Sequence, residues 1–258
     1  VCPHAAIRAY LVNEDEAKNA PAGFTMVDAK GTAGLKYRLQ VSTLDCTGCG
    51  SCAESCLAKD KALTMQPVDD TMYDETNWNY ALSLSDKPGV FDRKTLKGSQ
   101  FAQPLVEFSG ACAGCGETPY AKLITQLYGE KTNWVNGVGC STAWAGAFPS
   151  LAYAKNKEGR GPSYYATLFE DQAENGMGVV LAVKQRRNYV RLQAESLLGL
   201  TGSEELKAAI NAWLESFEDL DRNDSDARVL IAALEKAELT GEAKIAAENI
   251  LKNKDQLG

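Results

Sequence analysis

The order of apolar and polar residues predicts a chain that begins with short strands and ends in long helices. Residues 5–10 and 37–41 alternate between apolar and polar side chains, which is typical of half-buried strands, and residues 61–65 have the same character. Two further short strands are predicted at 105–108 and 132–136, and a glycine-rich turn follows each of them. The first half of the chain therefore contains the strands.

A helix is predicted after the turn that follows residue 108. Thr118 suits its N-cap and Pro119 its first helical position, because proline has no N–H to lose there. Apolar residues then recur at helical spacing, and Gly129 is expected to end the helix.

The last third of the chain has the pattern of a helical segment. A long helix is predicted to run to about Leu198, and Ser203 is expected to cap the next one. Two Ala- and Glu-rich helices follow at roughly 226–239 and 241–254. The residues of this helical segment indicate a role as scaffold or interface rather than in catalysis or ligand binding.

These patterns together predict a mixed fold, α+β followed by α/β, with three segments. Residues 1–66 form the first segment, which contains an insertion at 11–42, and residues 67–104 form an acidic, turn-rich connector. Residues 105–258 form the last segment, with a charged helical insert at about 200–258. Trp78 and Tyr80 are expected to hold the connector to the body by burial.

Charge and composition narrow the classes of partner. The 258 residues carry a formal net charge of -7 and a pI near 5.0, which argues against a nucleic-acid partner. The basic run 184–187 is interpreted as one turn of a solvated helix face. No apolar run approaches the roughly 20 residues of a membrane span, and no signal peptide precedes the first cysteine. We expect a cytoplasmic protein without a membrane partner.

Four of the eight cysteines form one compact motif. Cys46, Cys49, Cys52 and Cys56 have the spacing C-x2-C-x2-C-x3-C of a bacterial-type 4Fe-4S site, in which the fourth cysteine binds the other cluster of a pair. Such a run ends in Cys-Pro, and the chain opens with this dipeptide at Cys2. Cys2 is therefore predicted to complete the cluster of the first three cysteines of the motif.

The same rule implies that Cys56 binds a second cluster, whose other three cysteines precede residue 1. The chain begins with Val1 rather than Met, so we expect it to be a piece of a longer polypeptide. A zinc site made of four thiolates is the alternative, although such sites usually have a longer loop between two C-x2-C pairs. His4, the one histidine, is expected to be a surface residue beside the cluster.

A second group of cysteines follows the strand at 105–108. Cys112 and Cys115 lie in a glycine-rich loop with Glu117, and Cys140 follows the strand at 132–136. Loops at strand ends are where α/β sheets bind ligands, so these three thiols are predicted to hold another iron–sulfur cluster that lacks its fourth ligand here. A thioredoxin-like redox pair is the alternative for Cys112 and Cys115, and a dipole-stabilised acid at a helix start is the alternative for Glu117.

These motifs resemble pyruvate:ferredoxin oxidoreductase over about residues 1–180. The resemblance lies in the segments 46–56, 97–101, 108–120 and 139–141, and the third of these joins a cysteine pair to a glutamate in one loop. Leu57 replaces the proline expected after Cys56, and the family's magnesium-binding Gly-Asp-Gly segment is absent from the chain.

The resemblance implies a thiamine diphosphate enzyme that oxidatively decarboxylates pyruvate to acetyl-CoA and CO2. It implies electron transfer through three 4Fe-4S clusters to ferredoxin or flavodoxin, coenzyme A as acetyl acceptor, Mg2+ with ligands outside this chain, and a homodimer. Residues 1–66 would match a two-cluster ferredoxin-like domain, and residues from 105 onward the first half of a thiamine-binding domain.

The resemblance also assigns roles to single residues. Cys112, Cys115 and Cys140 match three ligands of the cluster nearest the thiamine, Cys140 also lines that cofactor, and Glu117 matches a catalytic residue that contacts it. Three alternatives stay open from the residues: an oxidoreductase for another 2-oxoacid, a ferredoxin-type electron carrier with an inert extension, and a zinc-stabilised interaction module.

Overall fold

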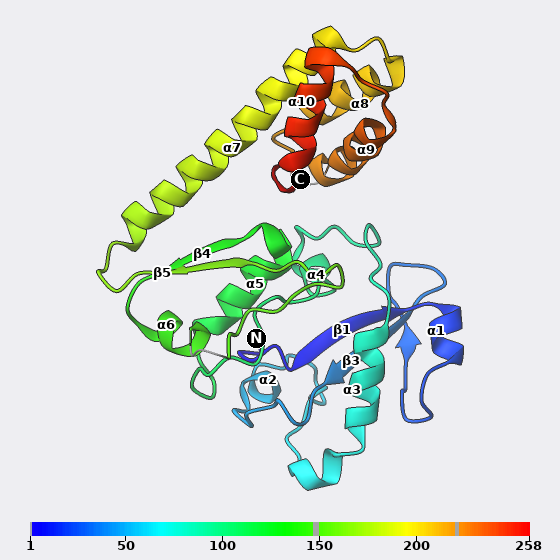
Figure 1. Cartoon of the computed structure of the whole chain (residues 1–258). Coiled ribbons are helices and arrows are strands. Elements are labelled where there is room, and N and C mark those ends of the chain that lie inside the picture. Colours follow the sequence, from blue (N-terminus) through cyan, green and yellow to red (C-terminus); the bar gives the residue numbers. More distant parts are fainter. Residues whose placement is uncertain (1, 147–149, 220–221) are drawn as a thin grey trace. The chain divides into compact units, whose positions relative to one another are not determined.

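The computed structural model describes residues 2–146, 150–219 and 222–258 as a mixed helix-and-sheet protein (Figure 1). The chain divides into two compact units, Val1–Gln172 and Ala173–Gly258. The strands lie in the first unit, and the second is helical. This agrees with the mixed fold predicted from the sequence.

A three-stranded antiparallel sheet with the order β1-β3-β2 organises the beginning of the first unit. β1 (Ile7–Val12) pairs with β3 (Lys36–Val41) over six residues, and β2 (Val27–Asp28) pairs with the start of β3. The strand predicted at 37–41 is confirmed, and the one predicted at 5–10 begins two residues later than expected.

The register of this sheet brings two distant cysteine segments to the same edge. Ile7 pairs with Val41, and a bond from the Ser42 N–H to the Ala6 carbonyl, 2.7 Å long, extends the ladder. Cys2 precedes Ile7 by five residues, and Cys46 follows Val41 by five. Because the strands are antiparallel, both cysteines leave the sheet at one end.

The strand predicted at 61–65 is wrong. The chain instead forms turns here after α2 (Ser51–Glu54), and Lys61 adopts a positive φ of 48°. The Lys61 N–H bonds to the Ala58 carbonyl, and the Ala62 N–H points at the sulfur of Cys56. These backbone donors therefore serve the turn around Cys56 and are not available to a ladder.

The predicted connector contains a helix that packs on the sheet. α3 (Asp74–Ser83) contacts β3 and buries Trp78, whose burial was predicted (Figure 1). The Arg8 guanidinium lies 4.9 Å from the centre of the Trp78 ring and forms an ion pair with Glu107. Arg8 thereby joins β1, α3 and the segment that leads to the second cysteine loop.

The predicted strand at 105–108 is only a single bridge, which joins Val106 and Tyr153. Its neighbour is α5 (Thr118–Tyr128), and the Leu105 N–H donates to the Thr125 hydroxyl of that helix at 3.0 Å. The Thr125 hydroxyl thus accepts the Leu105 N–H, which in a sheet would donate to a carbonyl of the neighbouring strand.

The predicted start of α5 is wrong by one residue, because Glu117 is its N-cap and Thr118 is already helical. Gly129 ends α5 as predicted. β4 (Asn133–Asn136) then pairs in parallel with β5 (Ser163–Ala166), and α6 (Cys140–Ala145) follows β4.

The second unit consists of helices packed around one apolar core. α7 (Gln172–Leu200) buries only its C-terminal half, through Val190, Ala194 and Leu197. The predicted Ser203 cap is confirmed, since its side chain accepts a bond from the Leu206 N–H. The remaining elements of the fold are α8 (Glu204–Glu215), α9 (Asn223–Lys236), α10 (Gly241–Lys252), α1 (Glu14–Lys18), α4 (Leu96–Ser99), η1 (Val68–Thr71), η2 (Gly129–Lys131) and η3 (Lys254–Gln256).

Arg187 corrects the prediction that the basic run 184–187 is only a solvated face. Its guanidinium donates to the Phe217 carbonyl at 2.7 Å and to the Gln256 carbonyl at 3.2 Å, and burial lowers its pKa. Arg187 therefore links the segment that follows α8 to the segment near the C-terminus of the helical unit. No helix in the described part of the chain is long and apolar enough to cross a membrane.

Candidate functional site

Four cysteines from two distant segments line one small cavity. Cys2, Cys46, Cys49 and Cys52 all contribute to its wall, together with His4 and Met65. The sheet register explains how Cys2 reaches the others, because β1 and β3 deliver their cysteine segments to the same edge. These are the four residues that the sequence predicts as ligands of one cluster.

The backbone around this cavity turns its N–H groups toward sulfur. Gly48 and Gly50 adopt positive φ angles of 67° and 74°, a conformation that glycine adopts without strain. The Ser51 hydroxyl lies 3.5 Å from the Cys49 sulfur, and this bond, with the Ser51 N–H, lowers the pKa of that thiol. A thiolate at Cys49 is therefore stabilised by its own loop.

Cys52 is partly buried, as Cys2 is, whereas Cys46 and Cys49 are exposed. Burial raises the pKa of Cys52 first, and the negative charges of Cys2 and Cys46 raise it further. Thiolates that repel one another in this way need a cation or a metal centre between them. The cavity is thus suited to hold a positively charged inorganic core.

His4 is buried, which corrects the prediction of a surface residue. It is 3% exposed, and its Nε2 has no hydrogen-bond partner in the part of the chain that the structure describes. Its backbone carbonyl accepts a bond from the Phe108 N–H at 3.1 Å, so the segment before the second cysteine loop covers it. Sequence spacing alone contains no signal for this long-range contact.

Cys56 does not line the cavity of the other four cysteines. Backbone N–H groups of Ala58 and Ala62 lower its pKa, and the Ala62 nitrogen lies 3.2 Å from the sulfur. Because Cys56 lies outside this cavity, its position is compatible with the prediction that it binds a different cluster.

The second cysteine loop has the same kind of backbone support. The Cys115 N–H donates to the Cys112 carbonyl at 3.0 Å, and the Glu117 N–H lies 3.4 Å from the Cys115 sulfur. The N–H groups of Thr118 and Glu117 lower the pKa of Cys115. The start of α5 therefore stabilises a thiolate at this position.

Glu117 is tied to the helix that begins at Cys140. The indole N–H of Trp144 on α6 donates to the Glu117 carboxylate at 3.0 Å, and the Gly110 N–H donates to the Trp144 carbonyl. This fixes α6 against the loop that contains Cys112 and Cys115. Within the described residues, no hydrogen bond or disulfide joins the Cys140 sulfur itself to those two thiols.

The two cysteine loops touch each other at Gly114. A β-carbon at Gly114 would lie 3.7 Å from Cβ of Cys49 and 3.6 Å from the Ser51 hydroxyl. The Gly114 N–H also helps to lower the pKa of Cys49. One peptide unit thus connects the loop of Cys112 and Cys115 to a sulfur of the first cavity.

Sequence reasoning missed Ser51 and Trp144 as site residues. Ser51 follows Cys49 by two positions, so a hydroxyl inside a cysteine run was an available signal. Trp144 had no such signal, because its bond to Glu117 depends on how α6 returns to the loop.

No group of three or more His, Cys, Asp or Glu side chains in the part of the chain that the structure describes is close enough to hold a single metal ion. A 4Fe-4S cluster has a different requirement, because each thiolate binds its own iron.

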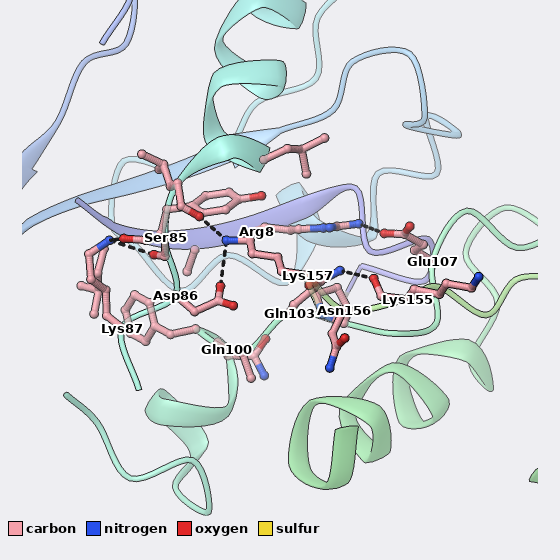
Figure 2. A pocket seen from close by; sticks show the side chains of 18 of the residues that line it. Arg8, Ser85, Asp86, Lys87, Gln100, Gln103, Glu107, Lys155, Asn156 and Lys157 are labelled. Carbon is pink, nitrogen blue, oxygen red and sulfur yellow. Dashed lines mark hydrogen bonds and ion pairs between the residues drawn. The ribbon is translucent and has the colours of Figure 1, made fainter. Parts of the chain in front are cut away.

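A larger cavity of about 340 Å³ lies elsewhere in the first unit and contains no cysteine (Figure 2). Its charged residues pair with one another: Arg8 with Glu107, and Lys157 with Asp86. Lys87 pairs with Glu16. Since most of these charges are satisfied internally, with Lys155 the exception among the described residues, the cysteine cavity is the stronger candidate for chemistry.

Comparisons with known proteins show what the chain is similar to. No protein-family model matches the chain. The chain is 47% identical, over its entire length, to pyruvate:ferredoxin oxidoreductase from Moorella thermoacetica, of which it covers 22%. It is 49% identical over 83% of its length to pyruvate-flavodoxin oxidoreductase from Enterobacter agglomerans, of which it covers 19%.

A third relative is pyruvate dehydrogenase [NADP(+)] from Cryptosporidium parvum, with 47% identity over 83% of this chain and 11% of that protein. The chain thus spans about a fifth of the length of the first relatives it matches.

Proposed function

Since the chain is similar over its whole length to a pyruvate:ferredoxin oxidoreductase and over 83% of its length to a pyruvate-flavodoxin oxidoreductase, we propose that it is the electron-transfer part of such an enzyme. The complete enzyme would oxidise pyruvate to acetyl-CoA and CO2 and pass the electrons to ferredoxin or flavodoxin. The observation that supports this best is that Cys2, Cys46, Cys49 and Cys52 line one cavity.

The donor set fits a 4Fe-4S cluster. Four soft thiolates meet at one place, and loop N–H groups point toward the sulfurs, as such clusters require. Cys112, Cys115 and Cys140 would contribute to a second cluster, and Cys56 to a third. When bound, the clusters would pass electrons on one at a time.

The residues of this chain would perform three tasks in electron transfer. The loop amides and the Ser51 hydroxyl stabilise charge on Cys49. Gly114 keeps the two cysteine loops in contact, so that an electron passes over a short covalent and hydrogen-bonded path. Trp144 holds Glu117 in place by its hydrogen bond.

The fit to thiamine diphosphate is incomplete within this chain. Glu117 is available as a cofactor contact and Cys140 as a lining residue, but the chain has no Gly-Asp-Gly segment for Mg2+ and the diphosphate. We therefore derive no chemical step on thiamine from these residues. The rest of the polypeptide would supply the magnesium ligands and the pyruvate and coenzyme A sites.

We extend the proposal to organisation. Residues 1–66 would be a ferredoxin-like domain, 67–104 a connecting segment, and 105–258 part of a thiamine-binding domain with a helical insert at about 200–258. The enzyme would be a cytoplasmic homodimer.

The test is anaerobic purification of the full-length protein followed by iron and acid-labile sulfide analysis and EPR. We expect pyruvate and coenzyme A to reduce the clusters, and Cys49→Ala to remove the signal of one cluster. Ser55→Ala, in the same loop but without a side-chain contact to sulfur, is the matched control. Clusters that stay oxidised with pyruvate and coenzyme A would refute the proposed activity.

The same analysis separates the alternatives. Zinc without iron or sulfide would favour an interaction module. Iron and sulfide, with electron transfer that is indifferent to Glu117→Gln, would favour an electron carrier with an inert extension.

A further inference from the structure

His4 is a buried polar side chain in the wall of the cysteine cavity. It is 3% exposed, and it lines the cavity together with Cys2, Cys46, Cys49 and Cys52. Its Nε2 atom is shielded from water and has no hydrogen-bond partner among the described residues. A buried polar atom without a partner costs free energy, so its presence here requires a physical reason.

A tight turn of the backbone holds His4 in this place. The Ala5 N–H donates to the Cys2 carbonyl at 3.5 Å, and Ala5 has a positive φ of 56°, which is strained for a residue with a β-carbon. The Arg8 Nε donates to the Ala5 carbonyl at 3.0 Å, and the Phe108 N–H donates to the His4 carbonyl at 3.1 Å. Strained backbone persists only where surrounding contacts hold it, so these bonds fix the imidazole beside the cavity.

The described residues around the imidazole leave sulfur as the main acceptor for Nε2. Glu107, which precedes the residue that binds the His4 carbonyl, has its carboxylate paired with Arg8. Apart from His4 and the cysteines, Thr47 is the one residue of the cavity wall with a polar side chain. A 4Fe-4S cluster bound here would supply negatively charged sulfurs, which accept hydrogen bonds more strongly than neutral thiols do.

We propose that His4 donates a hydrogen bond from Nε2 to a sulfur of the iron–sulfur cluster held by Cys2, Cys46, Cys49 and Cys52, and that this bond raises the reduction potential of the cluster. This inference rests on the proposed function. A neutral imidazole carries its proton on either nitrogen, and an acceptor at Nε2 selects the tautomer with the proton there. The bond is stronger to the reduced cluster, because the added electron increases the negative charge on the sulfurs.

The first measurement is a potentiometric titration of the anaerobic full-length protein, monitored by EPR, for the cluster whose signal Cys49→Ala removes. His4→Leu removes the donor and keeps a buried side chain of similar volume. We expect the ratio of reduced to oxidised cluster at a fixed potential to fall about tenfold, which is about 59 mV for a one-electron couple. His4→Gln places an amide N–H near the position of Nε2 and should restore most of the parent potential.

The second measurement detects the hydrogen bond itself. The full-length protein is produced with histidine that carries a heavy nitrogen isotope in its ring, and pulsed EPR of the reduced protein records magnetic coupling between the cluster and that isotope. The parent should show a ring-nitrogen coupling that His4→Leu loses. A histidine that only fills space beside the cavity would give no such coupling.

Trp134→Phe is the matched control for the loss of a buried N–H. The Trp134 indole N–H also has no hydrogen-bond partner among the described residues, but Trp134 does not line the cavity. Its loss should leave the potential of this cluster unchanged. If His4→Leu loses the cluster, His4→Gln and the ring-nitrogen coupling of the parent still decide, because the proposal requires both.

The inference is overturned if His4→Leu binds its full iron and sulfide with an unchanged potential, if His4→Gln shifts the potential as far as His4→Leu does, or if the parent shows no ring-nitrogen coupling. A parent protein without iron and sulfide contradicts the proposed function instead, so the two failures are distinguishable.

Discussion

Gly114 contacts Ser51 across the boundary between the two cysteine loops. The contact is close enough that a β-carbon at position 114 would meet the Ser51 hydroxyl at 3.6 Å, an ordinary van der Waals distance. A methyl group would therefore make an ordinary contact there, and a larger side chain would extend beyond it. Gly114 also has a φ of +77°, which disfavours any other residue.

Gly114→Val is predicted to separate the two loops and to weaken the coupling between their clusters. The positive φ costs about 1 to 2 kcal/mol of stability, and the branched side chain adds displacement. The measurement is the magnetic interaction between clusters in the EPR spectrum of the fully reduced protein, which should weaken. Gly116→Ala is the matched control, because nothing lies within 4 Å of its β-carbon and its φ is not positive. Equal spectra for parent and Gly114→Val would contradict the prediction.

Ser51→Ala is predicted to make the potential of one cluster more negative. The variant removes the hydroxyl that lies 3.5 Å from the Cys49 sulfur, and hydrogen bonds to charged groups contribute about 1.5 to 3 kcal/mol. Potentiometric EPR measures the shift. Ser51→Thr should restore most of the parent value, and Ser55→Ala should match the parent. A more positive potential in Ser51→Ala would be inconsistent with this role of the hydroxyl.

Trp144→Phe is predicted to lower pyruvate-dependent cluster reduction while the iron content stays constant. The variant keeps the aromatic packing but removes the N–H that donates to Glu117, at a stability cost of about 1 kcal/mol. Trp134→Phe is the control, because the Trp134 indole N–H has no hydrogen-bond partner among the described residues. The readouts are the rate of reduction after mixing with pyruvate and the melting temperature. Equal reduction rates in both variants would show that the bond to Glu117 is unimportant.

Glu16 is predicted to make the first unit sensitive to acid. Burial acts to raise the pKa of its carboxyl, but hydrogen bonds from Lys87 and Ser85 outweigh it, and the pKa falls from 4.5 to about 2. A carboxyl with a depressed pKa stabilises the folded state above its unfolded pKa, and this contribution is lost as pH falls. The window of loss therefore runs from about pH 4.5 to about pH 2.

Urea unfolding of Glu16→Gln at several pH values tests this. The variant should be about 1 to 2 kcal/mol less stable than the parent at pH 7, and the difference should shrink through that window. Glu14→Gln, an exposed carboxylate in the same helix, should follow the parent at every pH. A difference that is constant with pH would contradict the assignment.

Local chemistry made the helices predictable. The helices of the second unit follow from apolar periodicity and from the Ser203 cap, which satisfies a local donor whatever the rest of the chain does. Cysteine spacing likewise predicted which thiols lie together, since Cys2, Cys46, Cys49 and Cys52 line one cavity, and their role as ligands stays a prediction.

What sequence could not provide were contacts between distant segments. His4 is buried, and the N–H of the distant Phe108 binds its carbonyl. The failed strand at 61–65 has the same origin, since alternation predicts a strand only where a partner offers its backbone. Those donors belong to the turn around Cys56.

Under the proposed function, the pairing of Ile7 with Val41 has a consequence for cluster biogenesis. The ladder of β1 and β3 brings Cys2 to Cys46 by backbone bonds alone, so the four thiols gather when the polypeptide folds. A cluster delivered by a carrier protein would then meet a prearranged receptor and would not have to recruit a distant cysteine. A slip of one residue in the ladder would turn every side chain of the strand to the opposite face and dismantle that receptor.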